Sequence, residues 1–160
     1  MKRKQIFALV LIFLAVFLTG CQSGAPEMKI SSQTDIKSGD KGYIGLSVYG
    51  KDGAEIIKDI FVNSDYKGEE AISVADLLKD IGRELNMPVV FRDTFMGPYI
   101  DGINGLFELA HGAGSGWIYF VNGDPQGMGC ESYILHDGDY VEWRYTLDFG
   151  KDIDADRIVE

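Results

Sequence analysis

The first apolar stretch after residue 41 shows the alternation of a half-buried strand. Ile44, Leu46 and Val48 are separated by glycine and serine, so one face of the segment is apolar and the other is not. A turn follows at 50–53, and residues 56–62 are again mostly apolar. Two such runs joined by a short glycine-containing turn predict an antiparallel hairpin.

The periodicity then changes to that of a helix. Apolar residues between Val74 and Leu85 recur three and four positions apart and form one stripe. Ser73 and Asp76 match a capping box, in which each side chain bonds the backbone N–H of the other residue. Pro88 disfavours helical backbone at the residue before it. The sequence therefore predicts a helix that begins after Ser73 and ends before Pro88.

Downstream, short apolar runs are separated by glycine-containing turns, which predicts strands. Asn122-Gly123 is a strong signal for a tight hairpin turn, and Trp143 and Tyr145 alternate along the last run, as core residues of a strand do. The expected strands are 89–92, 99–103, 117–121, 133–135 and 140–146, with a brief strand or turn at 107–110. One helix packed on a mostly antiparallel sheet, with a β-rich C-terminal half, is an α+β fold.

The N-terminus predicts secretion and lipidation. A basic run at residues 2–4 precedes 13 apolar residues, 6–18, and the sequence Leu-Thr-Gly-Cys ends at Cys21. Such a stretch is shorter than the roughly 20 residues of a membrane-spanning helix. Leu-Thr-Gly-Cys resembles the bacterial lipobox, which implies a diacylglyceryl and palmitate anchor on Cys21. The alternative is an ordinary signal peptide or anchor helix with a chance cysteine.

These boundaries divide the chain into four parts. Residues 1–20 are expected to be a lipoprotein signal peptide that leaves Cys21 anchored on the extracytoplasmic face of a cell membrane. Residues 21–41 are polar and predict a flexible tether, with an extra edge strand as the alternative. The globular domain is expected at 42–147, and a C-terminal tail at 148–160.

Charge and cysteine content restrict the partners. The chain has 15 basic and 25 acidic residues, a formal charge of −10, and the part after residue 20 retains 12 basic and all 25 acidic residues, a charge of −13. This acidity argues against nucleic acid and against docking on anionic lipid. With Cys21 lipidated, Cys130 is the remaining cysteine of the two in the chain, so no disulfide framework is expected.

Two sequence blocks carry a resemblance to a known family. G-W-x-Y-x-V-N-G occupies 116–123, and Y-x-L-x-D-G-D-x-V-x-W-x-Y occupies 133–145. Together with Y-x-x-x-I-x-G at 99–105 and the helix that starts at 73, they resemble the transcobalamin-like C-terminal domain family over about 42–146. The resemblance implies a small β-rich domain that closes over a corrinoid held against a larger helical domain. The 160 residues contain no counterpart of that helical domain, so this domain offers one face to a ligand.

The resemblance also implies where a ligand is contacted. The matching positions lie at 97–99, at 116–117 and in the loop 124–129. An aromatic side chain at a junction of loop and strand, as at Trp117, can be half exposed and stack on a planar ligand. The residues expected to supply stacking and polar contacts are Tyr99, Trp117, Gln126 and Met128.

Cys130 is the fifth candidate. The resemblance implies a second cysteine on the last strand, near Leu147, and its absence leaves Cys130 without that partner. A buried, small apolar residue is the ordinary role of a free cysteine. A thiol ligand to a corrinoid cobalt or a haem iron and an intermolecular disulfide are the alternatives.

Other chemistry has little support in the sequence. The glycine-rich loop 111–116 enters a strand and lacks the lysine of a phosphate-binding loop. Ser115 does not lie in a G-x-S-x-G elbow, although a triad with His111 or His136 stays open. Asp137 and Asp139 flank a turn glycine, and turn chemistry explains them. We therefore expect neither enzymatic activity nor a metal site.

The sequence as a whole predicts a cell-surface lipoprotein with a ligand-binding module. On this hypothesis it captures a corrinoid, such as cobalamin, or a related tetrapyrrole, and delivers it to a membrane importer. The alternative is an envelope protein-interaction or adhesion module that has no small-molecule ligand.

Overall fold

The computed structural model describes residues 26–32, 35–95 and 97–155. The expected signal peptide at 1–20 and the lipid attachment site Cys21 lie outside these residues and stay predictions. Within the described part, no helix combines the length and the apolar character needed to cross a membrane.

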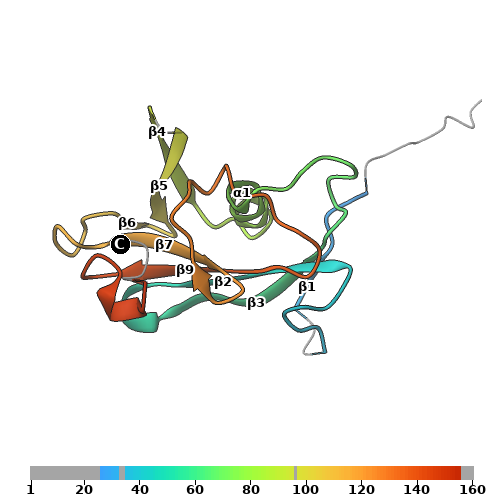
Figure 1. The fold of residues 1–160 in the computed structure, drawn as a ribbon, viewed down its shortest axis with the longest axis horizontal. Helices are drawn as coiled ribbons and strands as arrows, with labels where there is room; N and C mark the ends of the chain where they lie inside the picture. Colours follow the sequence, from blue (N-terminus) through green and yellow to red (C-terminus); the bar gives the residue numbers. More distant parts are fainter. Residues whose placement is uncertain (1–25, 33–34, 96, 156–160) are drawn as a thin grey trace, which may run out of the picture.

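The larger of the two sheets has six strands and carries the helix and the smaller sheet on one face (Figure 1). Its order is β1-β3-β2-β9-β7-β8. Neighbours are antiparallel except β2 and β9, which run parallel. The strands are β1 (Ile30–Ser31), β2 (Tyr43–Tyr49), β3 (Glu55–Asn63), β7 (Gly116–Val121), β8 (Asp124–Pro125) and β9 (Tyr140–Thr146).

The first two predicted strands form the expected hairpin. β2 pairs antiparallel with β3, and the 3-10 turn η1 (Lys51–Gly53) connects them. The range expected to be a flexible tether contains an edge strand, because Ile30 of β1 pairs with Val62 of β3. For residues 30–31, the structure therefore shows the alternative prediction, an extra edge strand.

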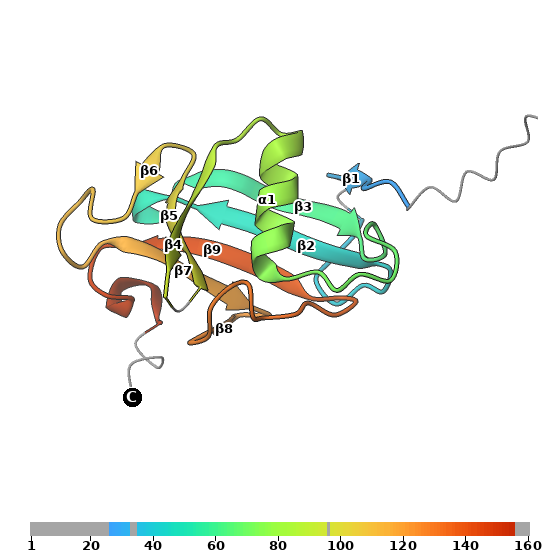
Figure 2. The same cartoon turned by 90° about the horizontal axis from the view of Figure 1, so that it is seen from above.

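The predicted helix is confirmed as α1 (Val74–Glu84), which crosses one face of the larger sheet (Figure 2). The Ser73 hydroxyl accepts a hydrogen bond from the Asp76 N–H at 3.1 Å, and the Asp76 carboxylate accepts one from the Ser73 N–H at 3.1 Å. The apolar stripe packs against the sheet and is completely buried at Leu77, Leu78 and Ile81.

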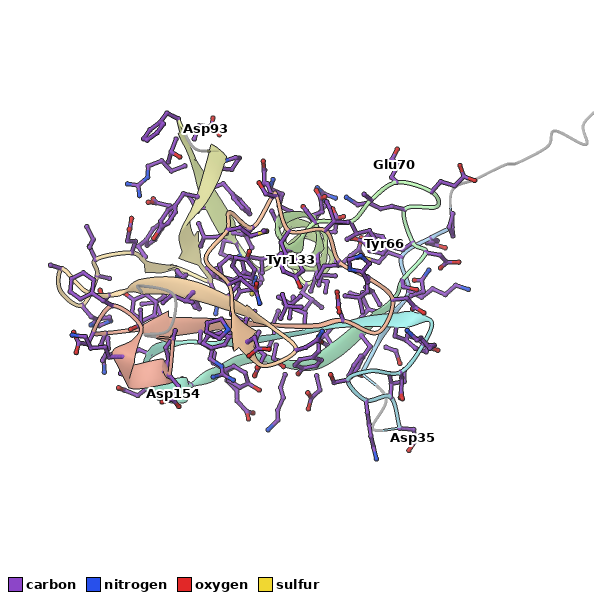
Figure 3. All side chains as sticks on the ribbon, in the orientation of Figure 1. Asp35, Tyr66, Glu70, Asp93, Tyr133 and Asp154 are labelled. Carbon is purple, nitrogen blue, oxygen red and sulfur yellow. The ribbon has the colours of Figure 1, made fainter. Side chains whose placement is uncertain are left out.

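A second, smaller sheet stands beside the helix. It contains β4 (Val89–Thr94), β5 (Gly97–Ile103) and β6 (Leu106–Phe107) in the order β4-β5-β6, all antiparallel. The β4–β5 hairpin projects away from the larger sheet (Figure 1). Asp93 lies near its tip (Figure 3). Phe95, two residues later, is 99% exposed. The sheet content and the one α-helix found among the described residues confirm the α+β, β-rich fold class.

The predicted strand at 133–135 is wrong. These residues form a loop with one isolated bridge, between Ser73 and Ile134. The Leu135 N–H donates to the Ile72 carbonyl at 2.8 Å, and the Val74 N–H donates to the Tyr133 carbonyl at 3.1 Å. The backbone of this loop is therefore hydrogen-bonded to the start of the helix, and it does not extend the sheet.

The chain after β9 folds back on the domain as far as the structure describes it. The 3-10 turn η2 (Lys151–Ile153) follows β9, and Ala155 is buried. Its geometry depends on Asp152, whose carboxylate accepts hydrogen bonds from the Thr146 hydroxyl and, at 2.8 Å, from the Leu147 N–H. Residues 148–155 of the expected tail thus form part of the folded domain.

Candidate ligand-binding site

A cavity of about 410 Å³ opens beside the β4–β5 hairpin. One wall is formed by β5, the floor by β7 and β9, and the opposite wall by the loop that follows β8. Phe149 and Ala155, from the segment after β9, complete the lining. The hairpin, the sheet and two loops that are far apart in the sequence therefore meet at one hollow.

All five candidate residues from the sequence line this cavity: Tyr99, Trp117, Gln126, Met128 and Cys130. They come from β5, from β7 and from the loop between β8 and β9. The structure thus brings them together at one place, while their contact with a ligand stays a prediction.

The expectation of a half-exposed Trp117 is wrong. The side chain is only 5% exposed, and its indole N–H donates to the Leu106 carbonyl at 2.9 Å. The Tyr145 ring packs against it edge to face, with 5.1 Å between the ring centroids. Trp117 lies on β7, which pairs with strands on both sides, and its side chain points into the core. It is therefore a fixed part of the cavity floor and no open stacking platform.

Tyr99 is more accessible to solvent than Trp117. Its ring is partly exposed, and the Arg92 guanidinium lies 5.5 Å from the ring centroid. Burial, together with the negative charge of the nearby Glu108, raises the pKa of Tyr99 to about 12. The phenol is consequently neutral at physiological pH and offers an aromatic face and a hydroxyl.

Met128 is the exposed tip of the opposite wall. Its side chain is 53% exposed, and glycines at 127 and 129 flank it. The Tyr119 hydroxyl donates to the Met128 carbonyl at 2.8 Å, which ties this loop to β7. Gln126 folds back, since its side-chain N–H donates to the Asp124 carbonyl at 2.9 Å. A flexible thioether on a loop fixed at one point suits contact with an irregular apolar ligand.

Cys130 is buried, with 5% of its surface exposed. Burial, reinforced by the charge of Glu131, raises the pKa of the Cys130 thiol to about 11. The thiolate is the form that binds a metal, and a thiol with a raised pKa is deprotonated less readily. The location favours the small apolar residue over a metal ligand or an intermolecular disulfide.

The cavity lining carries no formal charge at neutral pH, because it contains no aspartate, glutamate, lysine, arginine or histidine. A quarter of the residues in the chain are charged, so this is a local departure from the general composition. A buried charge without a counter-charge is unfavourable, so such a lining selects against charged groups.

A second hollow, of about 600 Å³, adjoins the first. The two share Tyr99, Trp117, Ile118 and Phe149, and the second has Glu108 and Lys151 at its wall. Phe149 was missed in the sequence, because it lies in the segment interpreted as a tail. No periodic pattern marks this residue, and only the fold of the 146–155 segment places it at the cavity.

The residues considered for a hydrolase serve the local structure. The Ser115 hydroxyl donates to the Gly112 carbonyl at 2.9 Å and accepts from the His111 N–H at 3.1 Å, which stabilises the turn. The His111 ring packs edge to face on Tyr145. Among residues 26–32, 35–95 and 97–155, no three histidine, cysteine or acidic side chains gather in a way that could hold a metal ion.

Comparison with known proteins agrees with this architecture. The family model of DUF4430, a domain of unknown function, matches residues 73–146. That range extends from the start of α1 to the end of β9 and so includes the cavity floor and both of its walls. No curated protein matches the chain.

Two solved structures have a similar fold. A protein from Ruminococcus gnavus, described as a candidate metal-binding protein, superimposes with a TM-score of 0.50 at 16% identity, covering 66% of this chain and 97% of that one. Haptocorrin in complex with Cbi superimposes with a TM-score of 0.51 at 17% identity, covering 67% of this chain. The match spans 26% of haptocorrin, about a quarter of its length. At these identities the similarity is one of fold.

Proposed function

We propose that this domain is a ligand-binding module whose site is the cavity between the β4–β5 hairpin and the 126–130 loop. The observation that carries the proposal is that all five candidate residues line that one cavity. Its volume lies within the range of roughly 300–1,000 Å³ that is usual for small-molecule sites, and its lining is apolar and aromatic with few polar groups.

The ligand that we propose is a corrinoid, such as cobalamin, or a related tetrapyrrole. The resemblance of blocks 116–123 and 133–145 to transcobalamin-like domains supports this choice, as does the similarity of fold to haptocorrin, a protein solved in complex with Cbi. A corrin ring with its side chains is larger than the cavity. One edge of the ligand therefore enters, while the rest lies against the exposed Tyr99, Met128 and Phe149.

In the cell, we propose that the domain is held outside the membrane by a lipid on Cys21 and passes its ligand to a membrane importer. The signal-like residues 1–18 and the Leu-Thr-Gly-Cys sequence support the anchor. Two or more acyl chains give stable anchoring, because each buried CH₂ contributes about 0.8 kcal/mol.

Titration of the purified full chain with cobinamide and with cobalamin tests the corrinoid proposal. The chain has two tryptophans, Trp117 and Trp143, and both line the cavity. A ligand there should produce a saturable change in tryptophan fluorescence. Free N-acetyltryptophanamide in the same titration corrects for absorption by the corrinoid. The absence of a saturable signal up to high micromolar concentrations would exclude corrinoids as the ligand.

A second candidate function, a protein-interaction module of the envelope, is favoured by one observation. Phe95 is 99% exposed near the tip of a projecting hairpin, where it contributes nothing to the core. A stoichiometric partner that is recovered from envelope extract by the wild-type chain, lost on Phe95→Glu, and unaffected by added cobinamide would support this function over ligand capture.

A further inference from the structure

One residue in the floor of the cavity, Trp143, carries a polar group without a partner. The indole N–H of Trp143 is buried and makes no hydrogen bond, and it is the one such side-chain atom in the part of the chain that the structure describes. An unpaired buried donor destabilises a fold, and buried donors in native proteins are paired in the large majority of cases. This exception therefore requires an explanation.

The other polar groups around it are already paired. The Trp117 indole N–H donates to Leu106, the Tyr119 hydroxyl donates to Met128, and the Gln126 amide donates to Asp124. Trp143 lines the same cavity as these three residues. Among these cavity-lining side chains, the Trp143 indole N–H is thus the donor without an acceptor.

We propose that the cavity binds an uncharged group with a hydrogen-bond-accepting oxygen, such as a carboxamide or a ketone, and that the Trp143 indole N–H donates to this oxygen. This inference rests on the proposed function, because it specifies the part of the ligand that enters the cavity. A carboxylate is excluded, since the lining holds no positive charge to compensate a buried negative one.

The arrangement of Tyr119 gives the acceptor a route to this donor. The Tyr119 and Trp143 rings are in contact, with 5.3 Å between their centroids, and the Tyr119 hydroxyl holds the loop at Met128. The glycines at 127 and 129 allow this loop to change its backbone conformation. Because the Trp143 N–H is buried, the proposal requires a local shift of this loop and of the side chains around Trp143 before an acceptor can reach it.

The two tryptophans allow a direct test by NMR. The full chain labelled with ¹⁵N-tryptophan should give two indole N–H signals, which Trp117→Phe assigns. The probes are acetophenone and α-methylstyrene, which have nearly the same shape but carry C=O and C=CH₂ respectively. We expect acetophenone to move the Trp143 indole proton downfield, as a new hydrogen bond does, and α-methylstyrene to leave it without such a shift.

Substitution of each tryptophan provides the matched comparison. Trp143→Phe removes the donor and should weaken acetophenone binding relative to α-methylstyrene by about threefold to tenfold, the effect of one hydrogen bond. Trp117→Phe alters the same cavity without removing the unpaired donor, so the preference for acetophenone should persist. The remaining indole signal in each variant shows whether the fold is retained.

Two results would overturn the inference: no downfield shift of Trp143 with acetophenone, or equal shifts with both probes. A repeat with cobinamide separates the inference from the proposed function. If cobinamide does not bind while acetophenone shifts the Trp143 signal, the corrinoid proposal fails and the inference holds. If cobinamide binds without a downfield shift of Trp143, the inference fails and the proposed function holds.

Discussion

At the scale of single residues, the two tryptophans show when the burial of a side chain can be predicted from the alternation of apolar and polar positions. Trp143 alternates with polar neighbours on β9, so its burial was predictable, and the structure confirms it. On β7 nearly every residue is apolar, so alternation does not indicate which side of the strand faces the core. The burial of Trp117 comes from its packing on Tyr145 and its hydrogen bond to Leu106, contacts that became evident only in three dimensions.

Tyr99 should contribute to ligand affinity, because its partly exposed ring lines both hollows. We expect Tyr99→Ala to weaken cobinamide binding by about tenfold, which corresponds to loss of an aromatic contact of roughly 1–1.5 kcal/mol. Ile134→Ala is the control, since Ile134 is similarly exposed but lines neither hollow. Equal affinities for the two variants in a fluorescence titration would remove Tyr99 from the site.

Tyr119 should contribute to stability through its hydroxyl. Tyr119→Phe removes the hydrogen bond to the Met128 carbonyl and should lower the free energy of unfolding by about 1 kcal/mol. Urea denaturation measures the effect. Tyr133→Phe serves as the control. Tyr133 lies in the loop before β9 (Figure 3), and its ring packs edge-on against Tyr119, but no hydrogen bond from its hydroxyl to the described residues is recorded. A larger loss for Tyr133→Phe would contradict this account.

At the scale of elements, those defined by local rules were predictable and those defined by distant partners were not. The α1 cap and the β2–β3 hairpin depend on residues a few positions apart, and both formed as expected. The 133–135 segment is apolar enough for a strand, but its hydrogen bonds go to residues 72 and 74, far away in sequence.

The capping box of α1 should be measurable in stability. Ser73→Ala removes the side-chain acceptor for the Asp76 N–H and should destabilise the protein by about 1 kcal/mol. Ser38→Ala, at an exposed position before β2, is the control. Thermal unfolding of both variants is the measurement: the midpoint should fall for Ser73→Ala and stay near that of the wild type for Ser38→Ala. An unchanged midpoint for Ser73→Ala would contradict the importance of the cap.

The segment after β9 should make stability depend on pH. Burial of Asp152 opposes its ionisation, but hydrogen bonds from the Thr146 hydroxyl and the Leu147 N–H lower the pKa of Asp152 below its usual value. A lowered pKa in the folded state adds stability above the ordinary aspartate pKa of about 3.9, and this stability is lost as the pH falls through the folded value.

Asp152→Asn should therefore reduce stability at pH 7 and flatten the decline of stability between about pH 5 and pH 3. Chemical denaturation at a series of pH values provides the measurement. Asp154→Asn, two residues away at an exposed position (Figure 3), should retain the dependence of the wild type. Identical pH profiles for the wild type and Asp152→Asn would show that the carboxylate does not contribute in this way.

At the scale of the whole molecule, the expected lipid anchor determines where the domain acts. We expect Cys21→Ala to transfer most of the protein from the membrane fraction to the soluble extracytoplasmic fraction, because the acyl chains are then absent. Fractionation followed by immunoblotting measures this distribution, and metabolic labelling with palmitate should lose its signal in parallel. Cys130→Ala is the control and should remain in the membrane fraction with its label.

The parallel pair at the centre of the larger sheet has a consequence for biogenesis. β9 lies between β2 and β7, and Gly45 pairs with Tyr140 near the other end of the chain. Contacts this distant in sequence form late in folding. A ribosome adds roughly 5–20 residues per second, so the sheet stays incomplete until almost all of the chain has been synthesised. If the chain is exported, as its N-terminus predicts, this delay favours transport before the sheet has formed.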